Sequence, residues 1–380
     1  MNLQGIDPSS GRAVSLEVTG GIVAGVREAA PDPGLPYICH GFLDLQVNGY
    51  RGIDYSGPEL LRADIARMVR YLAASGTTRH VPTIVTSGRD RILRNLEVIS
   101  AAAGEDPLLA AAVPGIHLEG PFICGEDGPR GAHDPRHVRN PSLSELGEWI
   151  EASASLLRIV TLAPELEGAE EFIREAVRRG IVVALGHTAA SGEQIARAIE
   201  AGATMSTHLG NGSHATLPRL RNYLWEQLGA DGLRASVIAD GFHLPDSVLR
   251  VFARAKGLER LSLVSDVAFL GGSEPGLYAW GGVEVEVHTD RHIGLRGTSF
   301  LAGAGHLLDW DIAHFARTTG TDIGVALRLA TENPASLIGL PALGPSFREG
   351  EPADIVRFTY DPARGPLGIV DAVFREETYR

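Results

Sequence analysis

The sequence predicts a parallel (β/α)8 barrel joined to a small β-sandwich that is built from both chain ends. From residue 41 onward, strand-like apolar runs alternate with helical segments, and eight such strands can be counted. Polar residues stand at the ends of nearly all of these runs. Short β-like segments that do not belong to this alternation of strands and helices lie at both termini. A doubly wound sheet is the alternative, but it concentrates function at one crevice, whereas a barrel uses the ends of many strands. We therefore expect a catalytic barrel over residues 41–340 and a β-domain formed by residues 1–40 and 341–380.

The two chain ends carry the strands that we assign to the β-domain. Residues Ala13–Thr19 and Ile22–Val26 have β character and flank Gly20-Gly21, which is a hairpin signal. Near the other terminus, Asp354–Phe358 and Ile369–Phe374 also resemble strands. Because all four segments lie outside the βα rhythm, we expect them to form one small unit.

The barrel strands are expected where apolar runs are bounded by turn residues. In chain order they are Phe42–Val47, Thr78–Val85, Ala111–Leu118, Leu156–Leu162, Ile181–Leu185, Thr204–Thr207, Ala235–Ala239 and Leu261–Val264. Several intervening segments begin at Pro or Ser and end at Gly, an asymmetry that is typical of helices. The clearest of them run from Pro58 to Gly76, from Ser191 to Gly202 and from Pro245 to Gly257.

The segment after the eighth strand departs from this rhythm. Residues Gly282–His288 alternate in hydrophobicity like a hairpin strand. Helical spacing then returns around Asp311–Arg317 and Ile323–Thr331.

Composition places the chain among ordinary globular proteins and argues against two classes of partner. Hydrophobic residues make up 44% and charged residues 21% of the 380 positions, and the 46 glycines suit a fold with many tight turns. A net charge of −13 argues against nucleic acid and against an anionic membrane surface. Cys39 and Cys124 make no disulfide framework, and no apolar run reaches the ~18 residues of a spanning helix. We expect a cytoplasmic protein.

Four of the predicted strands end in a residue that can bind a metal or move a proton. Glu119, His187, His208 and Asp266 each close an apolar run, and a barrel brings such ends to one rim. Carboxylate oxygen and imidazole nitrogen suit Zn2+ and other borderline divalent ions, and three protein ligands leave one position open for water. The first three residues therefore predict a site for one divalent metal ion, which we expect to be Zn2+, with Fe2+, Mn2+ and Co2+ as alternatives. A hydrogen-bonded structural role stays the alternative for each residue taken alone.

Asp266 is the predicted general base, because it ends the eighth strand beside the expected metal. A metal ion lowers the pKa of a bound water molecule, and a neighbouring carboxylate can take the proton and later return it to a leaving group. The alternative is that Asp266 caps the loop that follows its strand.

A series of short motifs runs in order from about residue 41 to residue 356. They are Gln46-Val-Asn48, His117-Leu-Glu-Gly-Pro-Phe122, Gly131-Ala-His133, Leu162-Ala-Pro-Glu165, Gly186-His-Thr188, Thr207-His-Leu209 with Asn211, Asp240-Gly-Phe-His243, Val264-Ser-Asp266 and Gly350-Glu-Pro-Ala-Asp-Ile-Val356. In this order they resemble the metal-dependent amidohydrolase superfamily, and within it the N-acetylglucosamine-6-phosphate deacetylase family. The superfamily usually has His-x-His where this chain has Gln46 and Asn48. Amides are poor ligands beside imidazole, so we expect one metal ion and not two.

The resemblance implies a role for each matched residue. It assigns Glu119, His187 and His208 to the metal, Asp266 to acid–base chemistry, and His133 to polarising the acetamide carbonyl. An ordinary loop histidine stays the alternative for His133. The residues that we expect to contact the substrate are Asn211, Arg219, His243, Gln46 and Asn48.

The loop after His208 departs from the family pattern. Arg219 lies eleven residues after His208, where the family has its phosphate-binding arginine. However, Gly210-Asn-Gly-Ser-His214 and Arg219-Leu-Arg-Asn222 replace the family's aromatic-Asn-Ala-Met and Arg-Glu-Pro-Gly sequences. These differences leave the metal residues intact but leave open whether the substrate carries a phosphate. A structural salt bridge is the alternative for Arg219.

Together these expectations describe a hydrolase that removes the N-acetyl group from an amino sugar. The resemblance implies N-acetylglucosamine 6-phosphate as substrate, with glucosamine 6-phosphate and acetate as products, and a homodimer as the assembly. Three alternatives stay open, namely a related amidohydrolase acting on another N-acyl sugar or a cyclic amide, a non-catalytic sugar-binding barrel, and a phosphate-binding isomerase.

Overall fold

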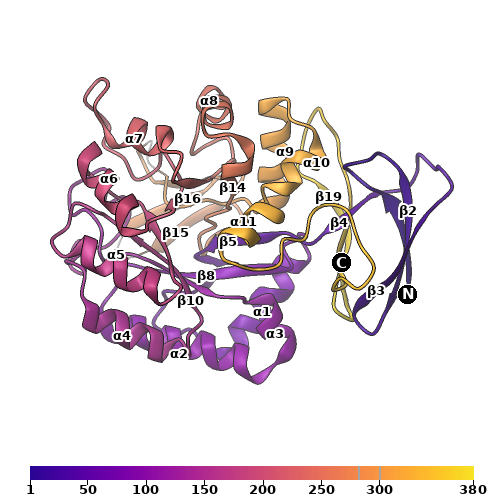
Figure 1. Ribbon diagram of the computed structural model, residues 1–380, viewed down its shortest axis with the longest axis horizontal. Helices are drawn as coiled ribbons and strands as arrows, with labels where there is room; N and C mark the ends of the chain where they lie inside the picture. The colour runs from indigo at the N-terminus through magenta and orange to yellow at the C-terminus, as the bar shows by residue number, and fades with distance from the viewer. Residues whose placement is uncertain (281–282, 299–300) are drawn as a thin grey trace.

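Eight parallel strands form the barrel, and their order in the sheet follows their order in the chain (Figure 1). The computed structural model describes residues 1–280, 283–298 and 301–380. The barrel strands are β5 (Leu43–Val47), β8 (Arg79–Val85), β9 (Ile116–Glu119), β10 (Leu157–Leu162), β11 (Val182–Leu185), β12 (Met205–Ser206), β13 (Arg234–Val237) and β14 (Leu261–Leu263). The ring closes at its carboxyl-terminal rim, because Asp266 N donates to Gln46 O and Asn48 N donates to Val267 O, both at 3.0 Å. The predicted fold class is confirmed.

Helices cover the outside of the barrel, as Figure 1 shows. They are α1 (Arg62–Ala73), α2 (Arg89–Glu105), α3 (Pro107–Ala112), α4 (Leu143–Ala152), α5 (Ala169–Arg178), α6 (Gly192–Ala201), α7 (Tyr223–Gly229), α8 (Asp246–Lys256), α9 (Leu308–Thr319), α10 (Ile323–Arg328) and α11 (Glu332–Leu337), with a short 3-10 turn at Leu258–Arg260. The predicted start and end residues agree with the structure at α6. There the Ser191 side chain accepts a hydrogen bond from Gln194 N, and Gly202 ends the helix with φ 114°. They agree also at α8, which follows Pro245 and stops before Gly257.

The third barrel strand begins later than the sequence predicted. We expected a strand over Ala111–Leu118, but Ala111 and Ala112 belong to α3 and the strand starts at Ile116. Asp106 caps α3 by accepting a hydrogen bond from Leu108 N at 2.8 Å, and Pro107 occupies the first turn. The run of Leu and Ala that follows favours a helix, so an apolar stretch was assigned to the wrong element.

Apolar side chains fill the lower part of the barrel, so polar chemistry is confined to the rim above them. This layer consists of Leu43, Leu45, Val81, Ile159, Ala184, Met205, Ile238 and Val264, with Ala304, Ala335 and Ile338 closing it. A larger core lies between the strands and the helices, and in it Phe122 stacks on Trp149 at 4.9 Å. The barrel is therefore a packed body and not a pore.

Both chain ends contribute to a second sheet beside the barrel (Figure 1). Its strands are β1 (Asn2–Ile6), β2 (Ala13–Thr19), β3 (Ile22–Glu28), β4 (Tyr37–His40), β18 (Asp354–Thr359), β19 (Gly368–Phe374) and β20 (Glu377–Tyr379), in the order β20-β19-β18-β4-β1-β2-β3. The sheet curls, because Val23 N donates to Glu351 O at 2.9 Å and Ala353 N donates to Gly21 O at 2.9 Å. The expected association of the two ends is confirmed, although β1, β4 and β20 were not predicted.

A buried ion pair joins this sheet to the barrel. Asp354, in β18, accepts a hydrogen bond from Thr78 Oγ1 at 2.6 Å and lies 2.9 Å from Arg79 Nε. Its side chain is 2% exposed. Within the sheet itself, Glu351 lies 3.1 Å from His40 Nε2 in β4. The Gly350-to-Val356 motif therefore fastens the C-terminal strand to the base of the barrel.

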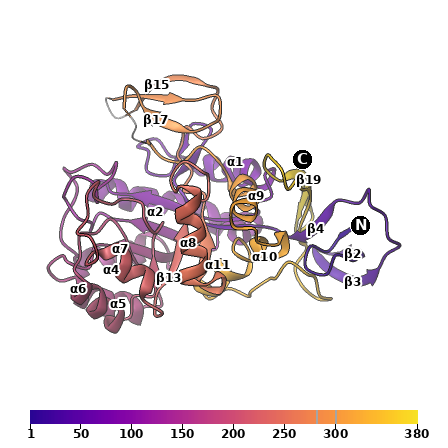
Figure 2. The same ribbon diagram turned by 90° about the horizontal axis from the view of Figure 1, so that it is seen from above.

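A third, smaller sheet is inserted between the eighth barrel strand and α9, and Figure 2 shows it standing beside the barrel. It consists of β15 (Gly276–Trp280), β16 (Val283–Val287) and β17 (Ile293–Leu295). The predicted strand Gly282–His288 corresponds to β16, and its first residue, Gly282, lies outside the described residues. A two-stranded hairpin, β6 (Gly49–Tyr50) and β7 (Ile53–Asp54), follows the first barrel strand. Among the helices described, none is both long and apolar enough to cross a bilayer.

Candidate metal centre

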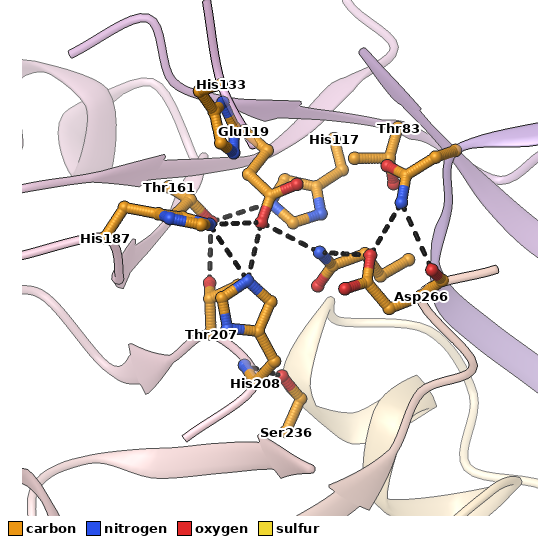
Figure 3. A network of polar contacts seen from close by, with 12 residues as sticks. Thr83, His117, Glu119, His133, Thr161, His187, Thr207, His208, Ser236 and Asp266 are labelled. Carbon is orange, nitrogen blue, oxygen red and sulfur yellow. Dashed lines mark hydrogen bonds and ion pairs between the residues drawn. The ribbon is translucent and has the colours of Figure 1, made fainter. Parts of the chain in front are cut away.

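Three side chains from the ends of β9, β11 and β12 meet at one point on the rim (Figure 3). His187 Nε2 and His208 Nε2 lie 3.1 Å apart, and Glu119 Oε1 lies 3.1 Å from the first and 2.8 Å from the second. All three residues are buried, with exposed fractions of 7%, 3% and 3%. The sequence predicted this convergence.

The spacing of these three atoms fits a shared divalent cation. In a tetrahedral site with metal–ligand distances near 2.1 Å, neighbouring ligand atoms are about 3.4 Å apart, a few tenths of an ångström longer than the edges of this triangle. His187 Nδ1 lies 2.8 Å from Pro129 O, so a proton on Nδ1 leaves the Nε2 lone pair free for a metal. Two imidazole nitrogens and a carboxylate oxygen are the donor set that Zn2+ and similar ions take.

The backbone is left-handed at three of the strand ends that form the site. The φ angle is 51° at His187, 29° at His208 and 51° at Asp266, and Gly120, directly after Glu119, has a φ of 79°. Such conformations are uncommon for residues with a Cβ atom, although His and Asp tolerate them better than most. Each turn lets its strand stop abruptly at the rim, so the side chain belongs to the site and not to the packed interior.

Burial and mutual hydrogen bonding set the electrostatics of the triangle. Burial would favour a neutral Glu119, but the close contacts with His187 and His208 outweigh it and hold the pKa of the carboxyl well below its usual value. Burial likewise acts to lower the pKa of His208, but the bond to Glu119 raises it. The centre is therefore built around a carboxylate that stays charged, which is what a cation requires.

Asp266 stands beside the triangle and is held by two amides (Figure 3). Asn48 Nδ2 donates to Asp266 Oδ1 at 2.6 Å, and Gln46 Nε2 donates to the same oxygen at 2.9 Å. Gln46 Nε2 also donates to Glu119 Oε1 at 2.9 Å, so this one amide bridges the two carboxylates. Burial, together with the charge on Glu119, raises the pKa of Asp266 to about 6. A carboxyl with such a pKa can both accept and return a proton near neutrality.

Gln46 and Asn48 were predicted to contact the substrate, and they do lie in the site. Their amide nitrogens, however, are bound to carboxylates, Gln46 to Glu119 and Asp266 and Asn48 to Asp266. Gln46 Oε1 and Asn48 Oδ1 are buried and have no hydrogen-bond partner among the described residues. Buried amide oxygens are usually satisfied, so these two are free to accept a bond from water or from a ligand.

His133 lies against the triangle on the side of a long loop. Its ring is 4.3 Å from the ring of His187, and its Nδ1 is 2.7 Å from Thr86 Oγ1. Ligand atoms of Glu119, His133 and His187 also lie within 4.8 Å of one another. We favour His208 as the third metal ligand because its Nε2 is at most 3.1 Å from both partners. Burial lowers the pKa of His133 to about 3, so it is neutral and can donate a hydrogen bond.

A chain of hydrogen bonds lies beneath the centre. His117 Nε2 is 2.7 Å from Thr161 Oγ1, which in turn is 2.6 Å from Thr207 Oγ1 (Figure 3). His117 is fully buried and its Nε2 is occupied by this contact. It therefore supports the strands under the site.

Two of the expected substrate contacts sit on loops at the rim. His243 Nδ1 is 2.7 Å from Asp240 Oδ2, and no hydrogen bond of its Nε2 is found among the described residues. Asn211 follows His208, and its Nδ2 is buried without a hydrogen-bond partner among the described residues. Both residues therefore present an unused polar atom.

Among the described residues, Arg219 has no contact with the centre. It is exposed on the loop before α7, and no hydrogen bond or ion pair of its side chain is found among the described residues. The alternative of a structural salt bridge has no support in the part of the chain that is described.

The sequence analysis gave no role to two polar groups that hold the site loops, although Glu165 stands in one of the matched motifs. Thr86 follows β8 and contacts His133. Glu165 follows β10 and accepts hydrogen bonds from Thr188 Oγ1 at 2.5 Å and Ala189 N at 2.6 Å, directly after His187. Glu165 follows its strand end closely, as Asp266 does, so the signal was available; a threonine such as Thr86 gives none.

Known proteins resemble this chain over nearly its whole length. The sequence model of the amidohydrolase family matches residues 37–377. The N-acetylglucosamine-6-phosphate deacetylase of Bos taurus is 34% identical over 87% of this chain and 81% of its own. The N-acetylgalactosamine-6-phosphate deacetylase of a Shewanella species is 32% identical, covering 90% and 86%. The crystal structure of the N-acetyl-D-glucosamine-6-phosphate deacetylase of Mycobacterium smegmatis superposes with a TM-score of 0.86 at 28% identity, covering 100% of this chain and 99% of that one.

Proposed function

Because this chain belongs to the amidohydrolase family, we propose that it hydrolyses the N-acetyl amide of N-acetylglucosamine 6-phosphate, giving glucosamine 6-phosphate and acetate. The observation that carries the proposal is the meeting of Glu119, His187 and His208 within 3.1 Å of one another beside Asp266. A sugar-binding protein without catalysis needs no such cluster, and neither does an isomerase. The named activity of the relatives supplies the substrate class.

We assign the metal to Glu119, His187 and His208, and we propose Zn2+ as the ion. When bound, the ion supplies a Lewis acid that lowers the pKa of a water molecule and polarises the substrate carbonyl. Asp266 is linked to the triangle through Gln46, and His133 lies against His187, so these two side chains flank the place that we assign to the water molecule and the acetamide.

Asp266 is the proposed proton carrier. Its carboxylate accepts a proton as the water oxygen bonds to the carbonyl carbon, and it returns that proton to the amide nitrogen as the carbon–nitrogen bond breaks. The amides of Gln46 and Asn48 fix the position of Oδ1, which leaves Oδ2 for the transfer. One water is consumed, and the products are a carboxylic acid and an amine.

His133 is the proposed donor to the carbonyl oxygen as negative charge develops there. Its neutral ring is oriented by Thr86, and it lies beside His187. A donor already held in place costs little reorganisation during the reaction.

The sugar phosphate is the least defined part of the proposal. Asn211 and His243 present free polar atoms at the rim, and they are the proposed contacts to the sugar or its phosphate. Arg219 is exposed, and its side chain has no partner in the part of this chain that is described, which suits an arginine that reaches the phosphate of a second copy in a homodimer. The Shewanella enzyme is nearly as similar to this chain as the Bos taurus enzyme is, with 32% against 34% identity. The C4 epimer, N-acetylgalactosamine 6-phosphate, is therefore the second candidate substrate.

The test combines metal analysis with acetate release. The purified protein is expected to hold one divalent ion per chain and to release acetate from one or both N-acetylhexosamine 6-phosphates faster than from unphosphorylated N-acetylglucosamine. Asp266→Asn should keep the ion and lower kcat by ~10²–10⁴-fold, the range typical of a lost acid–base group.

Two results would contradict the assignments. Undiminished turnover in Asp266→Asn would remove Asp266 from the mechanism. If Arg219→Ala slowed phosphorylated and plain sugars equally, the phosphate role of that arginine would fail.

A further inference from the structure

Five aromatic rings stack in a continuous row that joins the small sheet to the rim of the barrel. From the outside inward, His288 stacks on His292 at 3.8 Å, and His292 stacks on Phe242 at 4.9 Å. Phe242 then stacks on His306 at 5.9 Å, and His306 stacks on Trp310 at 4.3 Å. The ring planes of neighbours differ by 4° to 27°, so faces meet along the whole row. This row is called the ring stack below.

The ring stack connects segments that are distant in the sequence. His288 and His292 border the turn between β16 and β17, Phe242 lies on the loop after β13, and Trp310 lies in α9. Hydrogen bonds tie the members to their surroundings, because His306 Nε2 contacts Asp290 O at 2.9 Å and His292 Nδ1 contacts Asp290 Oδ1 at 2.6 Å. The turn of the small sheet is thus held against the barrel loop by both stacking and hydrogen bonds.

Phe242 directly precedes His243 in the loop after β13. This loop therefore connects the ring stack to His243. Asp240 Oδ1 accepts hydrogen bonds from Phe242 N and His243 N, both at 2.8 Å, while Oδ2 contacts His243 Nδ1. Trp310 Nε1, at the inner end of the stack, donates to Asp240 O at 3.0 Å. Both ends of the Asp240–His243 turn are therefore fixed by members of the same row of rings.

The small sheet also contacts the segment that follows Asp266. Ala268 and Leu270 pack with Val285, Val287 and Ile293 in an apolar cluster that is separate from the barrel core. The sheet therefore touches two rim loops at once, through apolar packing on one and through the ring stack on the other.

We propose that the sheet β15–β17 is a positioning element for substrate binding, and that the ring stack holds His243 in the orientation in which its free Nε2 faces the sugar site. The inference rests on the proposed function, because His243 is assigned there to the sugar or its phosphate. Phe242 is assigned here as a positioning residue. Its ring stacks with His292 at 4.9 Å and with His306 at 5.9 Å.

The first test needs no substrate. In the full-length metal-loaded protein, amide hydrogen exchange over residues 240–244 is measured for wild type, His292→Ala and His292→Phe. The alanine variant removes a ring between His288 and Phe242, so exchange in this loop should rise at least fivefold, whereas the phenylalanine variant keeps a ring and should restore slow exchange. The control is Arg296→Ala, because Arg296 follows β17 and, among the described residues, its side chain pairs with Glu284 at the exposed surface.

The second test is kinetic and uses the phosphorylated substrate. His292→Ala should raise KM about tenfold with kcat within twofold of wild type, because the chemistry at Asp266 is untouched, and His292→Phe should return KM to near the wild-type value. Unchanged exchange and unchanged KM in His292→Ala would overturn the proposal, as would a failure of the phenylalanine variant to rescue either. If wild type released no acetate, the proposed function would fail, while the exchange experiment would still decide whether the stack holds the loop.

Discussion

Replacing Gln46 by methionine tests the bridge between the two carboxylates of the site. Gln46 Nε2 lies 2.9 Å from Glu119 Oε1 and 2.9 Å from Asp266 Oδ1, and the side chain is fully buried. Methionine has nearly the same length and no donor, so Gln46→Met removes both hydrogen bonds without opening a large cavity. Each bond to a charged group contributes ~1.5–3 kcal/mol.

The loss of two such bonds sets the expected size of the effect. The lower bound is about 3 kcal/mol, which corresponds to roughly a 150-fold fall in kcat/KM if the bonds are fully used in the transition state. Metal affinity should also weaken by ~10–100-fold, since a partner of the ligand Glu119 is lost. Asn48 still holds Asp266 at 2.6 Å, so activity should fall without vanishing.

The assay is initial-rate acetate release at saturating metal, with bound metal measured on the same samples. Gln46→Glu is the matched comparison, because it keeps the length but adds a third carboxylate next to Asp266 and Glu119, and it should be the more damaging change. Wild-type kcat/KM in Gln46→Met at saturating metal would refute the view that this amide organises the acids.

Three further predictions concern stability. His80 is fully buried, and burial lowers its pKa to about 3, so below pH 6.5 the unfolded chain binds a proton that the native state does not. Between pH 7.5 and pH 5, the free energy of unfolding measured in urea titrations should then fall by about 2 kcal/mol more in wild type than in His80→Leu. Parallel pH profiles of the two proteins would contradict this. Asp354→Ala should lower the free energy of unfolding by about 3 kcal/mol, because it leaves Arg79 buried without its partner, and a loss below 1 kcal/mol in denaturant titration would count against that ion pair. Removal of metal with a chelator should lower the melting temperature, and Zn2+ at about 1,000 times its Kd should restore about 4 kcal/mol, whereas Glu119→Gln should show little response to added Zn2+.

The site was easier to predict than the elements around it. Glu119, His187, His208 and Asp266 each end an apolar run, and the rule that parallel strands meet at one rim is independent of sequence details, so their convergence could be inferred. Arg219 could not be placed, because its position depends on a long loop whose course is set by contacts between distant residues.

The elements that were missed depend on partners far away in the chain. β4 is short, and it pairs with β18 from the other chain end, with Ile355 opposite His40. The boundary error at Ala111 arose because an apolar run of four to eight residues fits a strand and a buried helix equally well. The ring stack had no sequence signature at all, since its histidines become neighbours only after β16 and β17 have folded against the loop after β13.

The left-handed turns at His187, His208 and Asp266 restrict which amino acids these positions could ever accept. A β-branched side chain would be strained there, whereas Asn, Asp, His and Gly are tolerated. Three of these four carry donor atoms that bind metals or protons. The backbone conformation thus limits the substitutions at these positions. Most of the residues that it tolerates there carry a donor atom of a different kind. Directed changes of metal preference should therefore begin with His-to-Asp and His-to-Asn exchanges at these positions, because they demand nothing new of the backbone.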